Sequence, residues 1–181
     1  MRSYLRYNVA GGTYFFTLVT YDRRGFLTSP LARACLRNAF RSVRETRTFQ
    51  IVAIVLLPDH LHCVWELPSG DSDYSTRWRR IKSLFTKCWL AGGRAEGERD
   101  DSRNKKAERA ICQRRFYEHM VRDEEDLERC VDYIHWNPVK HGLVSRVRDY
   151  SWSSFHRFVK LGHYDLGWGG ENPVVEFEHP E

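Results

Sequence analysis

The segment FQIVAIVLLPDHLHCVWEL, residues 49–67, decides the fold of this chain because it holds two strands and the turn between them. Its first nine residues, apart from Gln50, are apolar without alternation, which is typical of a strand buried on both faces. Pro58-Asp59 is a turn signal. The remaining residues alternate, so His60 and His62 share one face and apolar side chains occupy the other. The segment therefore predicts two neighbouring strands with two histidines at the start of the second.

The flanking sequence predicts the other elements of a single domain. They are a strand at 13–20, a helix at 29–45, a helix at about 76–91 with Ser75 as N-cap, a strand at 115–121 and a helix from Asp123 to Pro138. A short helix is the alternative for 115–121. This order predicts an α+β ferredoxin-like sandwich, with an antiparallel sheet of four or five strands and packed helices.

The ends of this domain are also predictable. We place the domain at residues 1–154 and a C-terminal extension at 155–181, whose aromatic content predicts that it packs on the domain. No apolar run approaches the roughly 18 residues of a membrane span, and the N-terminus lacks the apolar core of a signal peptide. Five scattered cysteines without a C-x-x-C pair predict reduced thiols in a cytoplasmic protein.

Positive charge is concentrated in one part of the chain. The formal net charge is +5, and residues 77–115 hold thirteen arginines and lysines among several aromatic side chains. Such a surface suits single-stranded nucleic acid, and a solvated helix followed by a charged loop at 92–110 explains it equally well. The candidates for contact with a DNA backbone are Arg77, Arg79, Arg80, Lys82 and, after the last helix, Lys140.

His60 and His62 lie two residues apart on a strand, so their Cα atoms are about 7 Å apart and both rings can reach one cation. By itself this pair is weak evidence for a metal site, because paired histidines at strand ends are more often hydrogen-bonded polar residues beside a turn. In the helix from Asp123, Tyr133 and Asn137 lie one turn apart. If that flank of the helix faces the histidines, two imidazoles and an amide oxygen can hold Mg²⁺ or Mn²⁺.

Tyr133 would then be a nucleophile, because a cation that polarises a phosphate makes a phenol reactive toward it. The alternatives are simpler. Tyr133 is then a helix tyrosine half-buried against the sheet, and Asn137 a helix residue that precedes proline.

The motifs LPDHLHCVW (57–65) and VDYIHWNPVKHGLV (131–144), with GGTYFFT before them and FYEHMVRDEEDL between them, closely resemble the REP-associated tyrosine transposases. These are single-tyrosine HUH transposases related to bacterial insertion-sequence enzymes. The resemblance covers about residues 4–154.

It implies that His60, His62 and Asn137 bind the divalent cation and that Tyr133 attacks a phosphate of single-stranded DNA. The products would be a 5′-phosphotyrosyl DNA and a free 3′-hydroxyl, formed beside the hairpin of a repetitive extragenic palindrome. It favours a monomer and leaves a dimer open.

Two other functions are compatible with parts of the sequence. A nucleic-acid-binding module without catalysis would explain the charge and the aromatic residues, but it gives Tyr133 and Asn137 no role. A metallohydrolase would use the same ligands and differ only in that water attacks the phosphate.

Overall fold

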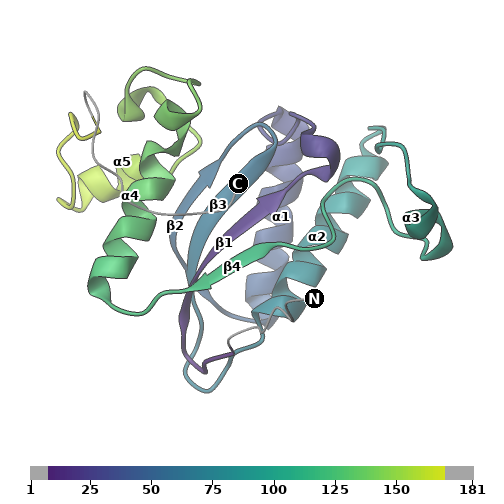
Figure 1. The fold of residues 1–181 in the computed structure, drawn as a ribbon, viewed down its shortest axis with the longest axis horizontal. Helices are drawn as coiled ribbons and strands as arrows, with labels where there is room; N and C mark the ends of the chain where they lie inside the picture. Colours follow the sequence, from purple (N-terminus) through teal and green to yellow (C-terminus); the bar gives the residue numbers. More distant parts are fainter. Residues whose placement is uncertain (1–7, 170–181) are drawn as a thin grey trace, which may run out of the picture.

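Residues 8–169 of the chain are described by a computed structural model, in which one antiparallel sheet has helices on both faces (Figure 1). The strand order is β2-β3-β1-β4. The elements are β1 (Thr13–Val19), η1 (Tyr21–Arg23), α1 (Pro30–Thr46), β2 (Gln50–Leu56), β3 (His60–Glu66), α2 (Tyr74–Ala91), α3 (Asp101–Lys105), β4 (Tyr117–Met120), α4 (Glu124–Lys140), η2 (Val147–Asp149) and α5 (Phe155–Lys160). The order and the antiparallel pairing confirm the predicted α+β sandwich.

Strand β3 lies at the centre of this arrangement. It pairs with β1 on one side and with β2 on the other, and Thr17 of β1 stands opposite His62. The predicted alternation is confirmed, because Leu61 and Trp65 enter the core beneath α1 and α2, whereas Val64 packs in the core beneath α4. The two histidines therefore face α4.

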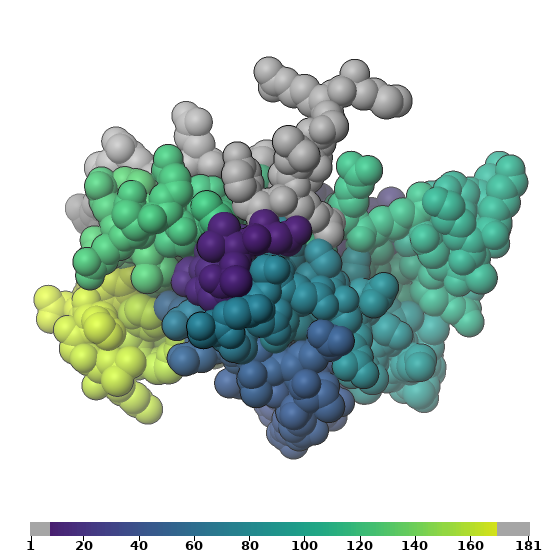
Figure 2. All heavy atoms as spheres, turned by 90° about the horizontal axis from the view of Figure 1, so that it is seen from below, coloured from purple at the N-terminus to yellow at the C-terminus, as the bar shows by residue number. Residues whose placement is uncertain are grey.

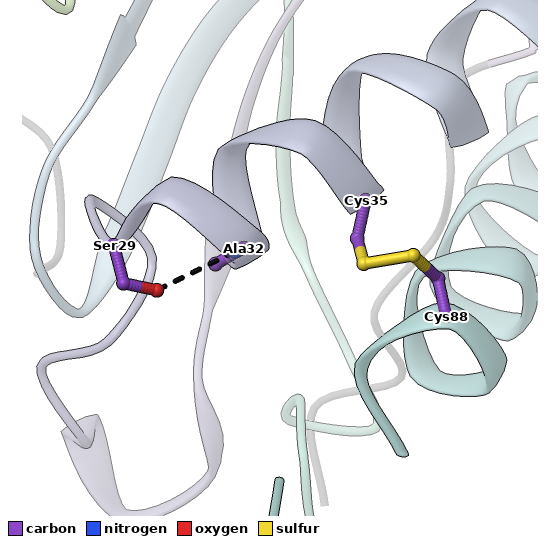
Figure 3. The surroundings of a disulfide bond; sticks show 4 residues. All are labelled: Ser29, Ala32, Cys35 and Cys88. Carbon is purple, nitrogen blue, oxygen red and sulfur yellow. Dashed lines mark hydrogen bonds between the residues drawn. A yellow bond between two sulfur atoms is a disulfide. The ribbon is translucent and has the colours of Figure 1, made fainter. Parts of the chain in front are cut away.

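Helices α1 and α2 cover the first face of the sheet (Figure 1). Helix α1 begins at Pro30 after Ser29, whose side chain accepts a hydrogen bond from the amide of Ala32. A disulfide joins Cys35 of α1 to Cys88 of α2 (Figure 3). The prediction of five reduced thiols is therefore wrong for this pair. The two cysteines are 53 residues apart, and only the packing of α1 on α2 brings them together.

Helix α4 covers the second face, with the segment that follows it alongside (Figure 1). Asp123 is its N-cap and accepts a hydrogen bond from the amide of Asp126, at the predicted capping position. The helix does not end at Pro138 as predicted but continues to Lys140. Pro138 lies in the last turn, where its missing N–H removes a single helical hydrogen bond, and the chain leaves the helix at Gly142, with φ of +64°.

Three other local predictions need correction. Helix α2 begins at Tyr74, and its N-cap is Asp73, which accepts from the amide of Thr76, and not Ser75. The charged segment 92–110 contains the short helix α3. Strand β2 is not buried on both faces along its length: it forms an edge of the sheet, and its first residue, Gln50, is exposed.

The exposed edge of β2 is covered by residues from the end of the chain. The amide of Leu56 donates to the carbonyl of Trp152, the amide of Ser154 donates to the carbonyl of Ile54, and Arg157 donates to the carbonyls at 51 and 52. The aromatic rings of Phe158 and Tyr164 pack against the core beneath α4. The domain boundary at residue 154 stays a prediction, and residues 170–181 of the predicted extension lie outside the described residues.

No helix within residues 8–169 combines the length and apolar character that crossing a membrane requires.

Candidate active site

His60 and His62 are buried at the α4 face of β3, and the protein orients both rings. Nδ1 of His60 lies 2.6 Å from the carboxylate of Asp59, and Nδ1 of His62 lies 2.8 Å from Oγ1 of Thr17. The ring centroids of the two histidines are 4.8 Å apart. Because the Asp59 carboxylate can only accept, it fixes the tautomer of His60 in which Nε2 is the ligating nitrogen, as in carboxylate–histidine–metal sites, and the Thr17 hydroxyl holds Nδ1 of His62 in place.

The environment of His60 favours its neutral form. Burial lowers its pKa more strongly than the hydrogen bond and charge of Asp59 raise it. For Asp59, burial alone would raise the pKa, but His60 and the guanidinium of Arg23 outweigh it and hold the pKa below its usual value. Near neutral pH the pair is therefore an imidazole beside a carboxylate, which is the state that binds a cation.

Tyr133 projects from α4 toward the same histidines. Its ring centroid is 5.3 Å from that of His62, with the planes at 69°. Its hydroxyl oxygen lies 3.4 Å from Nζ of Lys140, two turns further along the helix. The side chain is almost fully buried, and its ring meets Phe15 of β1 edge-on. Tyr133 is thus brought to His62 by packing of α4 on the sheet.

Asn137 is buried one turn beyond Tyr133 on α4. Within residues 8–169, neither its side-chain oxygen nor its side-chain nitrogen has a hydrogen-bond partner. An unsatisfied buried carboxamide costs roughly 1–3 kcal/mol, so a bound group that contacts Asn137 would recover this cost. Its oxygen suits a divalent cation.

Three residues near the histidines were not selected from the sequence. Asp59 and Thr17 bind the two Nδ1 atoms, and the ring of His141 lies 5.1 Å from that of His60. Asp59 precedes His60 directly, so its role could have been suspected from the spacing. The positions of Thr17 and His141 depend on strand register and on the end of α4.

The predicted DNA-binding residues separate into three groups. Lys140 lies beside Tyr133. Arg79, Arg80 and Lys82 lie on α2, which packs on the opposite face of the sheet from α4, and Nζ of Lys82 donates to the carbonyls at 113 and 114. Arg77 is the third case.

The prediction for Arg77 is corrected by its burial, since only 1% of the residue is exposed. Its guanidinium is paired with the carboxylate of Asp71 and donates to the carbonyls of Arg47, Thr48 and Asp73. These bonds fasten α2 to the end of α1. The side chain is committed to the fold and does not reach DNA.

A second cluster with metal-binding side chains lies between β4 and the first half of α4. Ligand atoms of His119, Asp126 and Cys130 lie within 4.8 Å of one another. Arg122 donates to the Asp126 carboxylate from both its backbone amide and its guanidinium, and His119 bonds the same oxygen. These contacts neutralise Asp126 at the start of the helix. We assign the cluster to the fold and not to a cation.

No protein-family model matches the chain. Two curated proteins resemble it over their whole lengths. A REP-associated tyrosine transposase of Escherichia coli (strain K12) is 42% identical over 182 residues, covering 100% of this chain and 98% of that protein. A putative REP-associated tyrosine transposase of Haemophilus influenzae is also 42% identical, covering 98% of each.

A solved structure has the same fold. It is that of a REP-associated tyrosine transposase bound to a REP hairpin, with a TM-score of 0.79, 39% sequence identity and full coverage of both chains. The match covers the complete chain, and therefore the sheet, α4 and the segments that hold His60, Tyr133 and Asn137. The chain belongs to the family of REP-associated tyrosine transposases.

Proposed function

We propose that this protein cleaves and rejoins single-stranded DNA at repetitive extragenic palindromes through a 5′-phosphotyrosine intermediate on Tyr133. The observation that best supports the proposal is the contact between Tyr133 and His62, since a strand and a helix distant in sequence bring a phenol to a pair of oriented imidazoles. The relatives are tyrosine transposases, and one of them is bound to a REP hairpin in its solved structure.

The residues present fit a divalent cation. His60 and His62 each have Nδ1 held by a hydrogen bond, and Asn137 has a buried carboxamide that no described residue satisfies. These three side chains would hold Mg²⁺ or Mn²⁺, and a bound cation would neutralise charge on the phosphate. A mixed nitrogen and oxygen ligand set favours these catalytic ions over a closed structural zinc site.

The chain's own residues would perform the rest of the reaction. The hydroxyl oxygen of Tyr133 attacks phosphorus and loses its proton as the new P–O bond forms. The bond from phosphorus to the 3′ oxygen breaks, and that oxygen takes up a proton as a free 3′-hydroxyl. Attack by a 3′-hydroxyl on the phosphotyrosine reverses the step and joins strands. Lys140 would stabilise negative charge that develops on the Tyr133 oxygen.

Arg79, Arg80 and Lys82 of α2 remain proposed contacts for the DNA backbone, and their distance from Tyr133 would suit a hairpin stem better than the cleaved phosphate. A DNA substrate places the enzyme in the cytoplasm, and the resemblance favours a monomer. Gel filtration with light scattering would distinguish a monomer from a dimer.

The decisive experiment uses an end-labelled single strand that contains a REP hairpin and its flank, incubated with Mn²⁺. On a denaturing gel the wild type should give a labelled species of the size of protein plus DNA. Tyr133→Phe should give none while retaining DNA binding. An undiminished adduct in that variant would refute the assignment of Tyr133. Free 5′-phosphate ends without an adduct would indicate a hydrolase, and binding without cleavage would indicate a non-catalytic module.

The cation is tested separately. EDTA, or His60→Ala combined with His62→Ala, should abolish cleavage. His163→Ala, at an exposed histidine beyond α5, is the matched control and should cleave normally. Cleavage that survives both treatments would remove the cation from the mechanism.

A further inference from the structure

A large groove lies between α1 and the edge strand β2. Tyr133 lies on the opposite face of the sheet, beneath α4. The volume of the groove is about 1160 Å³, and its floor includes Phe40, Ile54 and Leu56. Arginines line its sides: Arg33, Arg37, Arg41 and Arg44 from α1, and Arg157 from α5. We call this feature the arginine groove. Figure 2 shows the C-terminal segment in yellow and the blue α1–β2 region next to each other on one face.

The four α1 arginines form one line. They are spaced by four, four and three residues, which keeps them on one side of a helix over about 16 Å. Arg37 and Arg41 are exposed, and no residue in 8–169 forms an ion pair with either. The acidic side chains that line the groove are Glu45 and Glu66, so positive charge predominates. An extended polyanion fits such a line.

The floor of the groove distinguishes a single strand from a duplex. Apolar side chains and an aromatic ring lie below the arginines, where a duplex would present only its phosphates and sugars. Trp152 is 39% exposed, and the guanidinium of Arg33 lies 3.5 Å from the centre of its ring. Exposed aromatic rings beside basic side chains are how single-stranded nucleic acid is bound, with bases stacked inward and phosphates outward.

The groove also leads toward the candidate active site. The amide of Leu56 donates to the carbonyl of Trp152, so Trp152 lies at the end of β2 that precedes His60. The amide of Leu27, just before α1, donates to the carbonyl of Pro58. The end of the groove that holds Arg33 and Trp152 is therefore next to the turn that begins the histidine strand.

We propose that the arginine groove binds about four nucleotides of single-stranded DNA that flank the cleaved phosphate, with a base stacked on Trp152 and phosphates on Arg37 and Arg41. This inference rests on the proposed function, because the bound strand is the flank of the DNA that Tyr133 would cleave. The groove would be a second contact surface for that DNA, on the face of the sheet that α1 covers. The groove would hold the flank in place during strand exchange.

The test measures binding apart from cleavage. A fluorescein-labelled dT8 strand is titrated with the full chain, and anisotropy is recorded from 50 to 200 mM salt. Trp152→Ala should weaken binding about ten-fold. Arg37→Ala with Arg41→Ala should reduce the slope of log K against log salt by about 1.4, which corresponds to two lost phosphate contacts. Arg122→Ala with Arg129→Ala removes two charges near the start of α4, on the other face of the sheet from α1, and should leave the affinity nearly unchanged.

A second readout locates the strand directly. A dT8 strand with one 5-iododeoxyuridine, irradiated in the complex, should crosslink to Trp152, as identified by mass spectrometry. The groove would be overturned if Trp152→Ala bound like the wild type, or if the Arg37→Ala, Arg41→Ala variant bound and crosslinked like it. A blunt duplex that competes as well as the strand would also overturn it. Formation of the Tyr133 adduct is scored on its own gel. Loss of the adduct in the wild type with intact groove binding would refute the proposed function and not the groove.

Discussion

The ammonium nitrogen of Lys140 lies 3.4 Å from the hydroxyl oxygen of Tyr133, on the same helix and on the face that packs against His62. Lys140 also lies 4.9 Å from the centre of the Tyr133 ring. This relationship exists because α4 continues through Pro138. If the helix ended before the proline, as the sequence predicts, Lys140 would not be held two turns beyond Tyr133.

Lys140→Met should slow adduct formation by about ten- to a hundred-fold, because a hydrogen bond to a charged group is worth roughly 1.5–3 kcal/mol. The variant should lose little affinity for the DNA strand, because the lost contact is to the attacking oxygen. Single-turnover adduct kinetics measure the rate, and fluorescence anisotropy measures the affinity. Lys160→Met, at an exposed position on α5, is the control. A loss of affinity as large as the loss of rate would indicate that Lys140 binds DNA and does not assist the phenol.

Arg77→Ala should lower the free energy of unfolding by about 2–3 kcal/mol, because three backbone carbonyls lose a charged donor inside the protein. Arg79→Ala, at an exposed position two residues later, should change it by less than about 0.5 kcal/mol. Urea unfolding of the two variants gives the comparison. Equal stabilities would show that Arg77 does not hold α2 to α1.

The stability of the fold should decrease in mild acid because of His135. Burial, with a smaller effect of the Arg157 charge, lowers its pKa to about 3, and Nε2 lies 2.8 Å from Oγ of Ser154. The unfolded chain binds a proton at about pH 6.5, so the stabilisation is complete above that pH and is lost as pH falls from about 6.5 to about 3. Between pH 7 and 5.5 the loss from this residue should be about 1 kcal/mol.

His135→Asn removes this titration while keeping a polar side chain at the position. Urea unfolding at pH 7 and pH 5.5 should therefore show a smaller decrease for the variant than for the wild type. Parallel decreases in the two proteins would contradict the assignment to His135.

The Cys35–Cys88 disulfide should protect two of the five cysteines from alkylation when the protein is denatured without a reductant. The mass of the intact protein gives the number of alkylated cysteines. Reduction should cost about 2–4 kcal/mol of unfolding free energy, since the bond closes a long loop in the unfolded chain. Cys35→Ser combined with Cys88→Ser should reproduce the cost and remove the response to reductant. Alkylation of all five thiols without reductant would show that the pair is reduced in the protein as purified.

Local patterns determine much of this protein without any tertiary information. The alternation from residue 60 to 67 places the histidines opposite the apolar side chains because neighbouring strand residues always point to opposite faces. The capping residue Asp123 marks where the helix begins. The helical repeat then places Tyr133 and Asn137 one turn apart, because residues four positions apart are neighbours on a helix surface. The order of strands and helices then leaves few topologies.

Relations between distant segments are decided only in the tertiary structure. Packing of α4 on the histidine face brings Tyr133 to His62, and packing of α1 on α2 joins Cys35 to Cys88 and buries Arg77. Arg77 has the same charge as Arg79 but lies on the inner side of its helix, so composition alone could not separate a structural arginine from one available to DNA. The arginine groove likewise depends on residues near 152 returning to the edge of β2, a contact between segments about a hundred residues apart for which the chain has no local signal.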